Sequence, residues 1–247
     1  MHKLFVISFF LIGSFTLLSC ESFTPITGAM GQNSSPSVNS VPSTSEINTG
    51  LKAALEKATD ISAKKLGSKD GYLNNLDVKI LFPEEAKNIE STLRSLGLGS
   101  MVDQVITSVN RAAEDAATSA IPIFTTAIKQ MTITDVKNIL LGDKNAATTY
   151  FSETTSPLLT AEFSPIIDAS LKKTDATKYW SDVMTRYNKV PFVKKVDTDL
   201  TSYVTKKAID GLFVEIAKEE LKIRGNISER TSPILQKVFG YADKEGK

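Results

Sequence analysis

The sequence predicts an all-α fold, a compact bundle of about eight to ten helices behind a disordered N-terminal tether. Two observations lead to this fold class. Apolar residues between positions 46 and 240 recur at helical steps of three and four, and Gly and Pro interrupt them at intervals. The run from Val78 to Phe82 is the only strand candidate, and Pro83 ends it. Residues 46–240 are long enough to form one domain with its own core.

Several short helices are predicted in the first half of this domain. Their apolar stripes cover residues 86–96, 102–116, 123–131 and 136–140. Pro83 and the two glutamates after it are typical of a helix start, and Gly97 is typical of a helix end. Thr132 or Thr134 is suited to cap the fourth helix, which stops before Gly142.

Three longer apolar stripes follow, over residues 158–171, 179–187 and 198–224. Pro165 should kink or divide the first of these helices, because proline lacks the N–H that the helix interior needs. The last stripe is wide, which indicates a central helix packed on more than one side. Gly211 inside it costs about 1 kcal/mol relative to alanine, so we expect a neighbouring helix to cross closely there.

Residues 1–19 are predicted to be a lipoprotein signal peptide. Lys3 precedes an apolar run too short to span a bilayer durably, and Leu17-Leu18-Ser19-Cys20 ends that run. This ending resembles the lipobox of bacterial lipoproteins. The resemblance implies that Cys20 becomes the first mature residue, with diacylglycerol on its sulfur and an acyl chain such as palmitate on its amine. Glu21 is not the aspartate of the commonest inner-membrane retention signal, which favours the outer membrane over the inner.

Residues 20–45 are predicted to form the lipidated cysteine and a disordered tether. Ser, Thr, Pro, Gly and Asn dominate this range, and no helical or strand period runs through it. A flexible segment of this length has a typical span of roughly 25–30 Å, so it would hold the domain near the membrane without fixing its orientation. The acyl chains on Cys20 would supply the membrane attachment. Residues 241–247 are predicted to be a flexible tail.

Composition excludes several kinds of chemistry. His2 is the only histidine and Cys20 the only cysteine, and the export signal uses both positions. The mature domain therefore has no residues for Ser-His-Asp or Cys-His catalysis, for the usual zinc sites or for disulfides, and we expect no cofactor and no metal. Removing Lys3 with the signal leaves equal numbers of basic and acidic residues, so no net field recruits nucleic acid.

Carboxylates on the predicted central helix form the first candidate cluster. They are Asp210, Glu215, Glu219 and Glu220. We interpret them as a solvated, ion-paired end of the helix, because lysines lie three and four residues away. The alternative is a carboxylate metal site or an acid–base pair. Asp210 is the candidate for a buried carboxylate, since it lies in an apolar stretch, and burial would require a partner such as Arg111 or Arg186.

Arg111 and Glu114 form the second candidate pair. They lie three residues apart on an alanine-rich helix, where small neighbours let another helix approach closely. This pattern predicts a partly buried ion pair that bridges helices. The alternative is an anion-binding arginine.

The segment Lys172–Lys195 combines aromatic and basic residues. The candidate binding residues are Tyr179, Trp180, Arg186, Tyr187, Lys189, Lys194 and Lys195. They can be core aromatics under a lysine-coated outer face. Alternatively, they form a recognition surface for an envelope lipid, a glycan such as lipopolysaccharide or peptidoglycan, or another envelope protein.

Several short runs together resemble a known family. They are 110–114 (NRAAE), 127–132 (AIKQMT), 179–180 (YW), 186–193 (RYNKVPFV), 203–205 (YVT), 207–213 (KAIDGLF), 230–232 (RTS) and 238–240 (VFG). In this order they resemble domain of unknown function 4197, a family of bacterial envelope proteins that often bear signal peptides. The resemblance implies an exported, all-helical protein and brings no catalytic residue with it.

The sequence thus leads to one main functional hypothesis and two alternatives. The main hypothesis is a lipid-anchored bacterial envelope protein whose helical domain binds a ligand or partner. The first alternative is a structural or assembly-factor lipoprotein, which a filled core with an exposed apolar patch would favour. The second is a carboxylate-based hydrolase, which would need two carboxylates facing one cleft.

Overall fold

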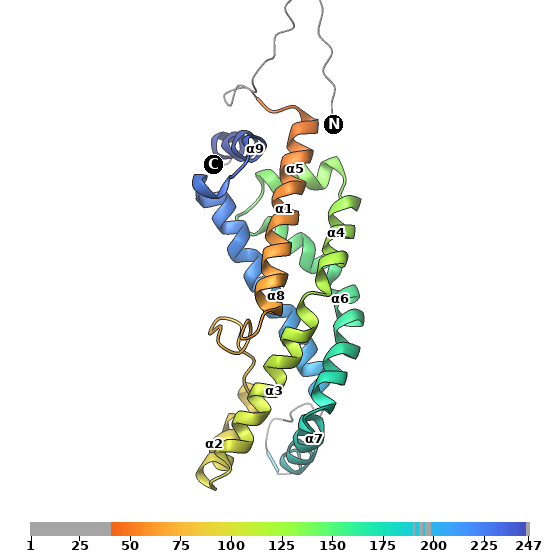
Figure 1. Ribbon diagram of the computed structural model, residues 1–247, viewed down its shortest axis with the longest axis vertical. Helices are drawn as coiled ribbons and strands as arrows, with labels where there is room; N and C mark the ends of the chain where they lie inside the picture. The colour runs from red at the N-terminus through yellow and green to blue at the C-terminus, as the bar shows by residue number, and fades with distance from the viewer. Residues whose placement is uncertain (1–40, 190, 193–194, 196–198, 246–247) are drawn as a thin grey trace, which may run out of the picture. The chain divides into compact units, whose positions relative to one another are not determined.

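The computed structural model describes residues 41–189, 191–192, 195 and 199–245 (Figure 1). The predicted signal peptide, Cys20 and most of the predicted tether lie outside these residues. All described residues belong to one unit of the chain, Pro36–Lys247. The helices within this range are α1 (Thr44–Gly67), α2 (Lys87–Ser95), α3 (Gly99–Ala117), α4 (Ala120–Gln130), α5 (Ile133–Leu141), α6 (Ala146–Lys172), α7 (Ala176–Tyr187), α8 (Leu200–Gly225) and α9 (Pro233–Glu245). Two single-turn 3₁₀ helices and no strand accompany them in the described part, which confirms the all-α prediction.

Helix α1 begins two residues before the domain start that the sequence predicts. Ser43 caps it, because its hydroxyl accepts a hydrogen bond from the Glu46 N–H and the Glu46 carboxylate accepts one from the Ser43 N–H. At the other end of the chain, α9 continues to Glu245, through most of the predicted flexible tail. The reason is that Asp243 pairs with Arg230 and that Tyr241 packs against the core.

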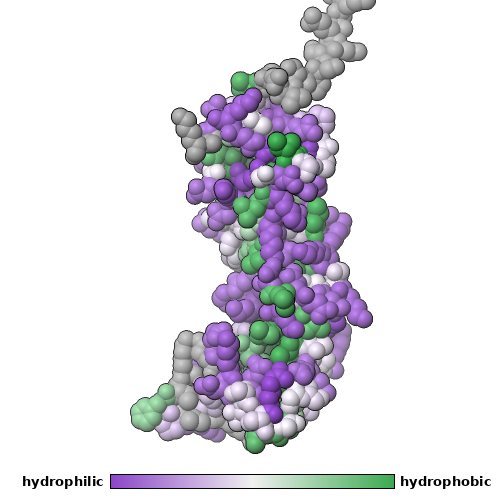
Figure 2. Space-filling view, turned by 90° about the vertical axis from the view of Figure 1, so that its left-hand side faces the viewer, coloured by the Kyte–Doolittle hydropathy of each residue, from purple (hydrophilic) through white to green (hydrophobic). Residues whose placement is uncertain are grey.

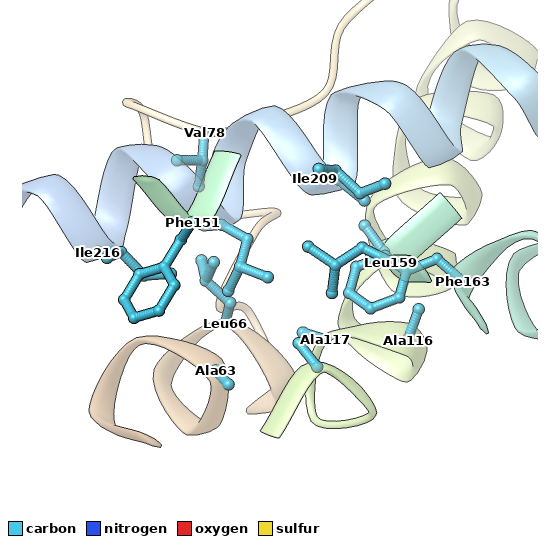
Figure 3. Close-up of a cluster of buried hydrophobic side chains, with 14 of the residues drawn as sticks. Ala63, Leu66, Val78, Ala116, Ala117, Phe151, Leu159, Phe163, Ile209 and Ile216 are labelled. Carbon is cyan, nitrogen blue, oxygen red and sulfur yellow. The ribbon is translucent and has the colours of Figure 1, made fainter. Parts of the chain in front are cut away.

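Helix α8 is the centre of the bundle. It contacts α1, α3, α6 and α7, and its residues Leu200, Val204, Ala208, Leu212 and Ile216 are all buried. Figure 3 shows side chains from α1, α3, α6 and α8 meeting in one cluster. The wide apolar stripe of this helix is therefore used on several sides, as the sequence predicts.

Gly211 permits a close approach, but not by a helix as predicted. A Cβ atom at this position would lie 2.8 Å from Cε1 of Tyr72 and 3.1 Å from Cβ of Val78. Both neighbours belong to the connection between α1 and α2. The expectation of a crossing helix is wrong, because an irregular segment with a buried tyrosine fills the space instead.

The run Val78–Phe82 is not a strand. The side chain of Asn110, which is buried on α3, takes the place of a neighbouring strand: its Oδ1 accepts from the Ile80 N–H and its Nδ2 donates to the Ile80 carbonyl, each at 2.8 Å. These two bonds satisfy the backbone of Ile80 without a sheet.

Helix α6 runs without a break through Pro157 and Pro165. Of the two effects expected of Pro165, a kink or a division, the division does not occur. Leu159, Phe163 and Ile167 on both sides of the proline are fully buried, and α6 packs along α8 and α3. This packing stabilises the helix beyond the loss of one backbone hydrogen bond.

The two ends of the bundle differ in the helices they carry (Figure 1). The start of α1 lies with α5 and α9 at one end, where these helices contact one another. Helices α2 and α7 lie at the other end, next to α3. Within the described residues, no helix is both long and apolar enough to cross a membrane.

Candidate functional site

Within the segment Lys172–Lys195, Lys172 ends α6, Ala176–Tyr187 form α7, and the described residues after α7 are 188–189, 191–192 and 195. Trp180, the largest aromatic residue in this segment, is part of the core. It is only 3% exposed. Its ring stacks on that of Tyr203, with 5.9 Å between the ring centroids, and the centroid of the Phe82 ring lies 5.3 Å from that of Trp180. Trp180 as a binding residue is therefore a wrong prediction, because this side of α7 faces the bundle.

Tyr179, by contrast, is 46% exposed. Successive residues of a helix point about 100° apart, so Tyr179 leaves the core where Trp180 enters it. Tyr187 is half-buried and packs against the core. Arg186 lies in α7, but its side chain is outside the description, and Lys194 as a whole is outside the described residues.

The turn after α7 exposes one more aromatic residue. Phe192 is 107% exposed and has a φ of 67°, a left-handed conformation that is uncommon for any residue except glycine, asparagine and aspartate. Lys189 and Lys195 on either side of it in sequence are also exposed. We call Lys189, Phe192 and Lys195 the α7 turn. In Figure 2 the lower end of the molecule, which carries α2 and α7, shows hydrophobic surface among hydrophilic residues.

Two apolar cavities inside the bundle are too small to hold a ligand. One, of about 10 Å³, lies between α1, α6, α8 and α9, and the other, of about 20 Å³, lies between α2, α3 and α7. Ligand pockets generally measure roughly 300 Å³ or more. Binding of a ligand is therefore to be sought on the surface of this domain.

Arg111 and Glu114 lie together. Arg111 Nη1 is 2.5 Å from Oε2 of Glu114, and its Nη2 is 2.6 Å from Oδ1 of Asp70. The other oxygen of Glu114 accepts hydrogen bonds from the N–H groups of Tyr72 and Leu73, at 3.1 Å each. The pair thus joins α3 to the connection after α1 rather than to another helix. Two carboxylates already occupy the guanidinium, which leaves the anion-binding alternative without support.

Asp210 is not buried, which corrects its prediction. Its side chain is 48% exposed and pairs with Lys206 at 2.8 Å, while Arg111 pairs with Glu114 and Asp70 instead. The apolar residues around Asp210 in sequence point to other sides of α8. The buried carboxylates of this helix are instead Glu215, Glu219 and Glu220, so this part of the helix is ion-paired as predicted but not solvated.

Glu215 lies in a buried charged network. Its oxygens accept hydrogen bonds from Lys65 at 2.6 Å, from Lys218 at 2.7 Å and from Asn75 at 3.0 Å. Burial raises the pKa of Glu215, but the hydrogen bonds from Lys218, Lys65 and Asn75 lower it more, to about 2. The carboxylate is therefore ionised and fully paired at neutral pH.

Glu220 and Arg224 connect the ends of two other helices. Glu220 accepts hydrogen bonds from the N–H groups of Ala147 and Thr148 at 3.0 and 2.9 Å, in the first turn of α6. Arg224 donates to the carbonyls of Leu140 and Ile139 at 3.1 and 2.6 Å, in the last turn of α5. Each charge also has the sign that stabilises the helix end that it contacts.

Sequence reasoning missed the roles of Glu215 and Glu220. The helical spacings of Glu215 with Lys218 and of Glu220 with Arg224 were the available signal, because pairs three and four residues apart meet on a helix. The tertiary partners come from α1, α5 and α6, and no local pattern reveals them. No cluster of three or more potential metal ligands occurs in the part of the chain that the structure describes.

Comparison with known proteins places this helical bundle in a family. The family model described as protein of unknown function (DUF4197) matches residues 41–240. The chain belongs to the DUF4197 family. The DUF4197 match begins just before α1 and ends within α9, so it covers the bundle and confirms the resemblance seen in the sequence. Curated proteins and solved structures gave no match to this DUF4197 chain.

Proposed function

We propose that this DUF4197 chain is a lipid-anchored bacterial envelope protein, favouring the outer membrane, whose helical domain binds an anionic lipid surface through the α7 turn. The lipobox pattern at Leu17–Cys20 supports the anchor, and Glu21 supports the outer membrane. The observation that carries the binding role is Phe192. This apolar ring is fully exposed on a left-handed backbone between two exposed lysines.

The backbone conformation and the exposure of Phe192 are both unfavourable in the free domain, which suggests a binding role for the ring. A left-handed backbone at a residue other than glycine costs of order 1–3 kcal/mol, and an exposed Phe forgoes about 1.5–3 kcal/mol of burial. Insertion of the ring into the acyl boundary of a lipid layer would recover the second amount. Lys189 and Lys195 would each gain about 1 kcal/mol next to anionic headgroups.

The α7 turn lies away from the end of the domain that the predicted tether joins. Helix α1, which follows the predicted tether, starts at the end of the bundle with α5 and α9. Helix α7 lies at the other end. Because the predicted tether would not fix the orientation of the domain, the α7 turn can reach a lipid surface although it lies at the end of the bundle opposite the start of α1.

An assembly role through protein contacts is the second candidate. The small size of the two apolar cavities favours it. Leu96 and Leu98, which are exposed between α2 and α3 at the same end as α7, favour it as well. Five cavities among the described residues are each lined by one carboxylate at most, so the hydrolase alternative gains no support from them.

The anchor is tested by replacing Cys20 with serine. We expect the Cys20→Ser chain to lose its partitioning into the detergent phase, because serine cannot accept the diacylglycerol that would hold the protein in the membrane. Phase separation in a mild detergent, with the wild-type chain run alongside, measures this. Unchanged partitioning of the variant would mean either an uncut signal peptide or an anchor other than the acyl chains on Cys20.

The α7 turn is tested in the Cys20→Ser background, where no acyl chain masks weak binding. The double variant Lys189→Gln and Lys195→Gln should bind anionic phospholipid vesicles about tenfold or more weakly at low salt, since two lysines lose about 1 kcal/mol each. Phe192→Ser should also weaken binding, both to anionic and to neutral vesicles. Vesicle co-sedimentation over a range of lipid concentrations gives the affinities.

The matched control removes two lysines at the other end of the bundle. Lys137 and Lys144 are exposed on and after α5, and replacing both by glutamine changes the net charge by the same amount. This control should bind almost as the parent does. Equal weakening in the control and the test variant would mean that net charge alone drives binding, and it would reject the α7 turn as the contact. Both variants should melt at nearly the parent temperature, because exposed charges contribute little to folding.

A further inference from the structure

A groove of about 320 Å³ lies between α6 and α8. Its walls carry the hydroxyl groups of Ser156 and Thr160 from α6 and of Ser202 and Thr205 from α8. Lys206 and Asp210, which form an ion pair, line it as well. We call it the hydroxyl groove. Its volume lies at the lower end of the range of small-molecule sites, so a ligand of one or two rings fits.

Thr205 is the unusual residue of this groove. It is 2% exposed, and its Oγ1 finds no hydrogen-bond partner among the described residues. Other threonines in these helices are satisfied: Thr155 donates to the Phe151 carbonyl at 2.6 Å, and Thr160 donates to the Ser156 carbonyl at 2.9 Å. A buried hydroxyl without a partner is unfavourable, and such groups generally have a partner in the functional state. Thr205 lines the groove, but its Oγ1 has almost no accessible surface, so its hydroxyl can donate to and accept from a ligand only where the groove wall moves aside.

The other hydroxyls of the groove offer mainly acceptors. Ser156 already donates to the Ser152 carbonyl at 2.6 Å, and Ser202 donates to the Asp199 carboxylate at 2.7 Å. Their free lone pairs, like the carboxylate of Asp210, accept hydrogen bonds from a ligand. A carboxylate has no donor to give and a phosphate dianion has only one, so an anion suits this groove poorly. Lys206 has hydrogens beyond the one that it donates to Asp210, so the groove offers donors as well.

We propose that the hydroxyl groove binds a short neutral saccharide. Each sugar hydroxyl both donates and accepts, which matches a wall of lone pairs with a few donors. This site is separate from the α7 turn and does not depend on it.

The probes are maltose and N,N′-diacetylchitobiose at millimolar concentration, observed by saturation-transfer NMR. The protein is the full chain in a detergent without a sugar headgroup. We expect transfer to at least one disaccharide. Thr205→Val should weaken that binding by about fivefold to tenfold, the usual contribution of one hydrogen bond. Thr205→Val should not lower the melting temperature of the free chain, because the hydroxyl it removes has no partner.

Three controls make the result decisive. Thr59→Val removes a buried hydroxyl of α1 that is bonded to the Leu55 carbonyl, and it should leave saccharide binding unchanged. Asp210→Asn, at an exposed position, should weaken binding even if Thr205→Val fails to fold. The Lys189→Gln and Lys195→Gln variant should bind the saccharide as the wild type does, which separates this site from the α7 turn.

The proposal is overturned if neither disaccharide shows transfer, or if Thr205→Val and Thr59→Val weaken binding equally. Transfer to spermidine in place of both sugars would also overturn it, because it would identify an ammonium site at the same acceptors.

Discussion

Glu220→Ala is expected to lower the free energy of unfolding by about 3–5 kcal/mol, the usual cost of removing one partner from a buried ion pair. The substitution leaves Arg224 without its carboxylate, although only 13% of the Arg224 side chain is exposed. It also leaves the N–H groups of Ala147 and Thr148 without their acceptor at the start of α6. Urea unfolding followed by circular dichroism measures the change.

Asp210→Ala is the matched control for this prediction. Asp210 lies on the same helix and pairs with one lysine four residues away, but it is exposed. Its replacement should cost no more than about 0.5 kcal/mol, as most surface substitutions do. If both variants lost the same small amount, the buried contacts of Glu220 would not stabilise the junction of α5, α6 and α8.

Trp180→Ala is expected to cost about 3–5 kcal/mol, because it removes a large buried aromatic side chain and leaves a cavity. The indole ring packs between Phe82, in the connection between α1 and α2, and Tyr203 on α8. Its loss should loosen the contact of α7 with the bundle. The melting temperature and the urea midpoint of the variant measure the effect.

The neighbouring residue gives the comparison. Tyr179→Ala should cost about 1 kcal/mol or less, since nearly half of this side chain is already in solvent. A large loss for Tyr179→Ala with a small loss for Trp180→Ala would mean that α7 is rotated relative to the structure described above.

The helices could be predicted because a helical period is a local signal. The stripe from Leu200 to Ile216 repeats every four residues, and each of its side chains is buried in the structure. The effect of Pro165 could not be predicted in the same way. Its local cost is visible in the sequence, but the packing of Leu159 and Phe163 that keeps α6 continuous is tertiary.

The candidate residues show the same division. The sequence indicates that Lys172–Lys195 is rich in rings and cations, but only the rotation of α7 decides that Trp180 is buried and Tyr179 exposed. Charge spacing on α8 predicts ion pairs without telling which pairs are buried. The apolar neighbours of Asp210 in sequence predict that its side chain is buried, although those neighbours lie on other sides of the helix. Partners from distant segments decide the burial of Glu215 and Glu220, and a single sequence does not contain that information.

The contacts of Glu220 and Arg224 also bear on how this chain can vary in length. These two side chains lie one turn apart on α8, and they hold the end of α5 and the start of α6. Gly142–Asn145 between the two helices therefore need not fix their geometry. A longer connection there would add loop-closure entropy, which rises only slowly with the number of residues. We therefore expect the α5–α6 connection to tolerate an insertion, or even a second small domain.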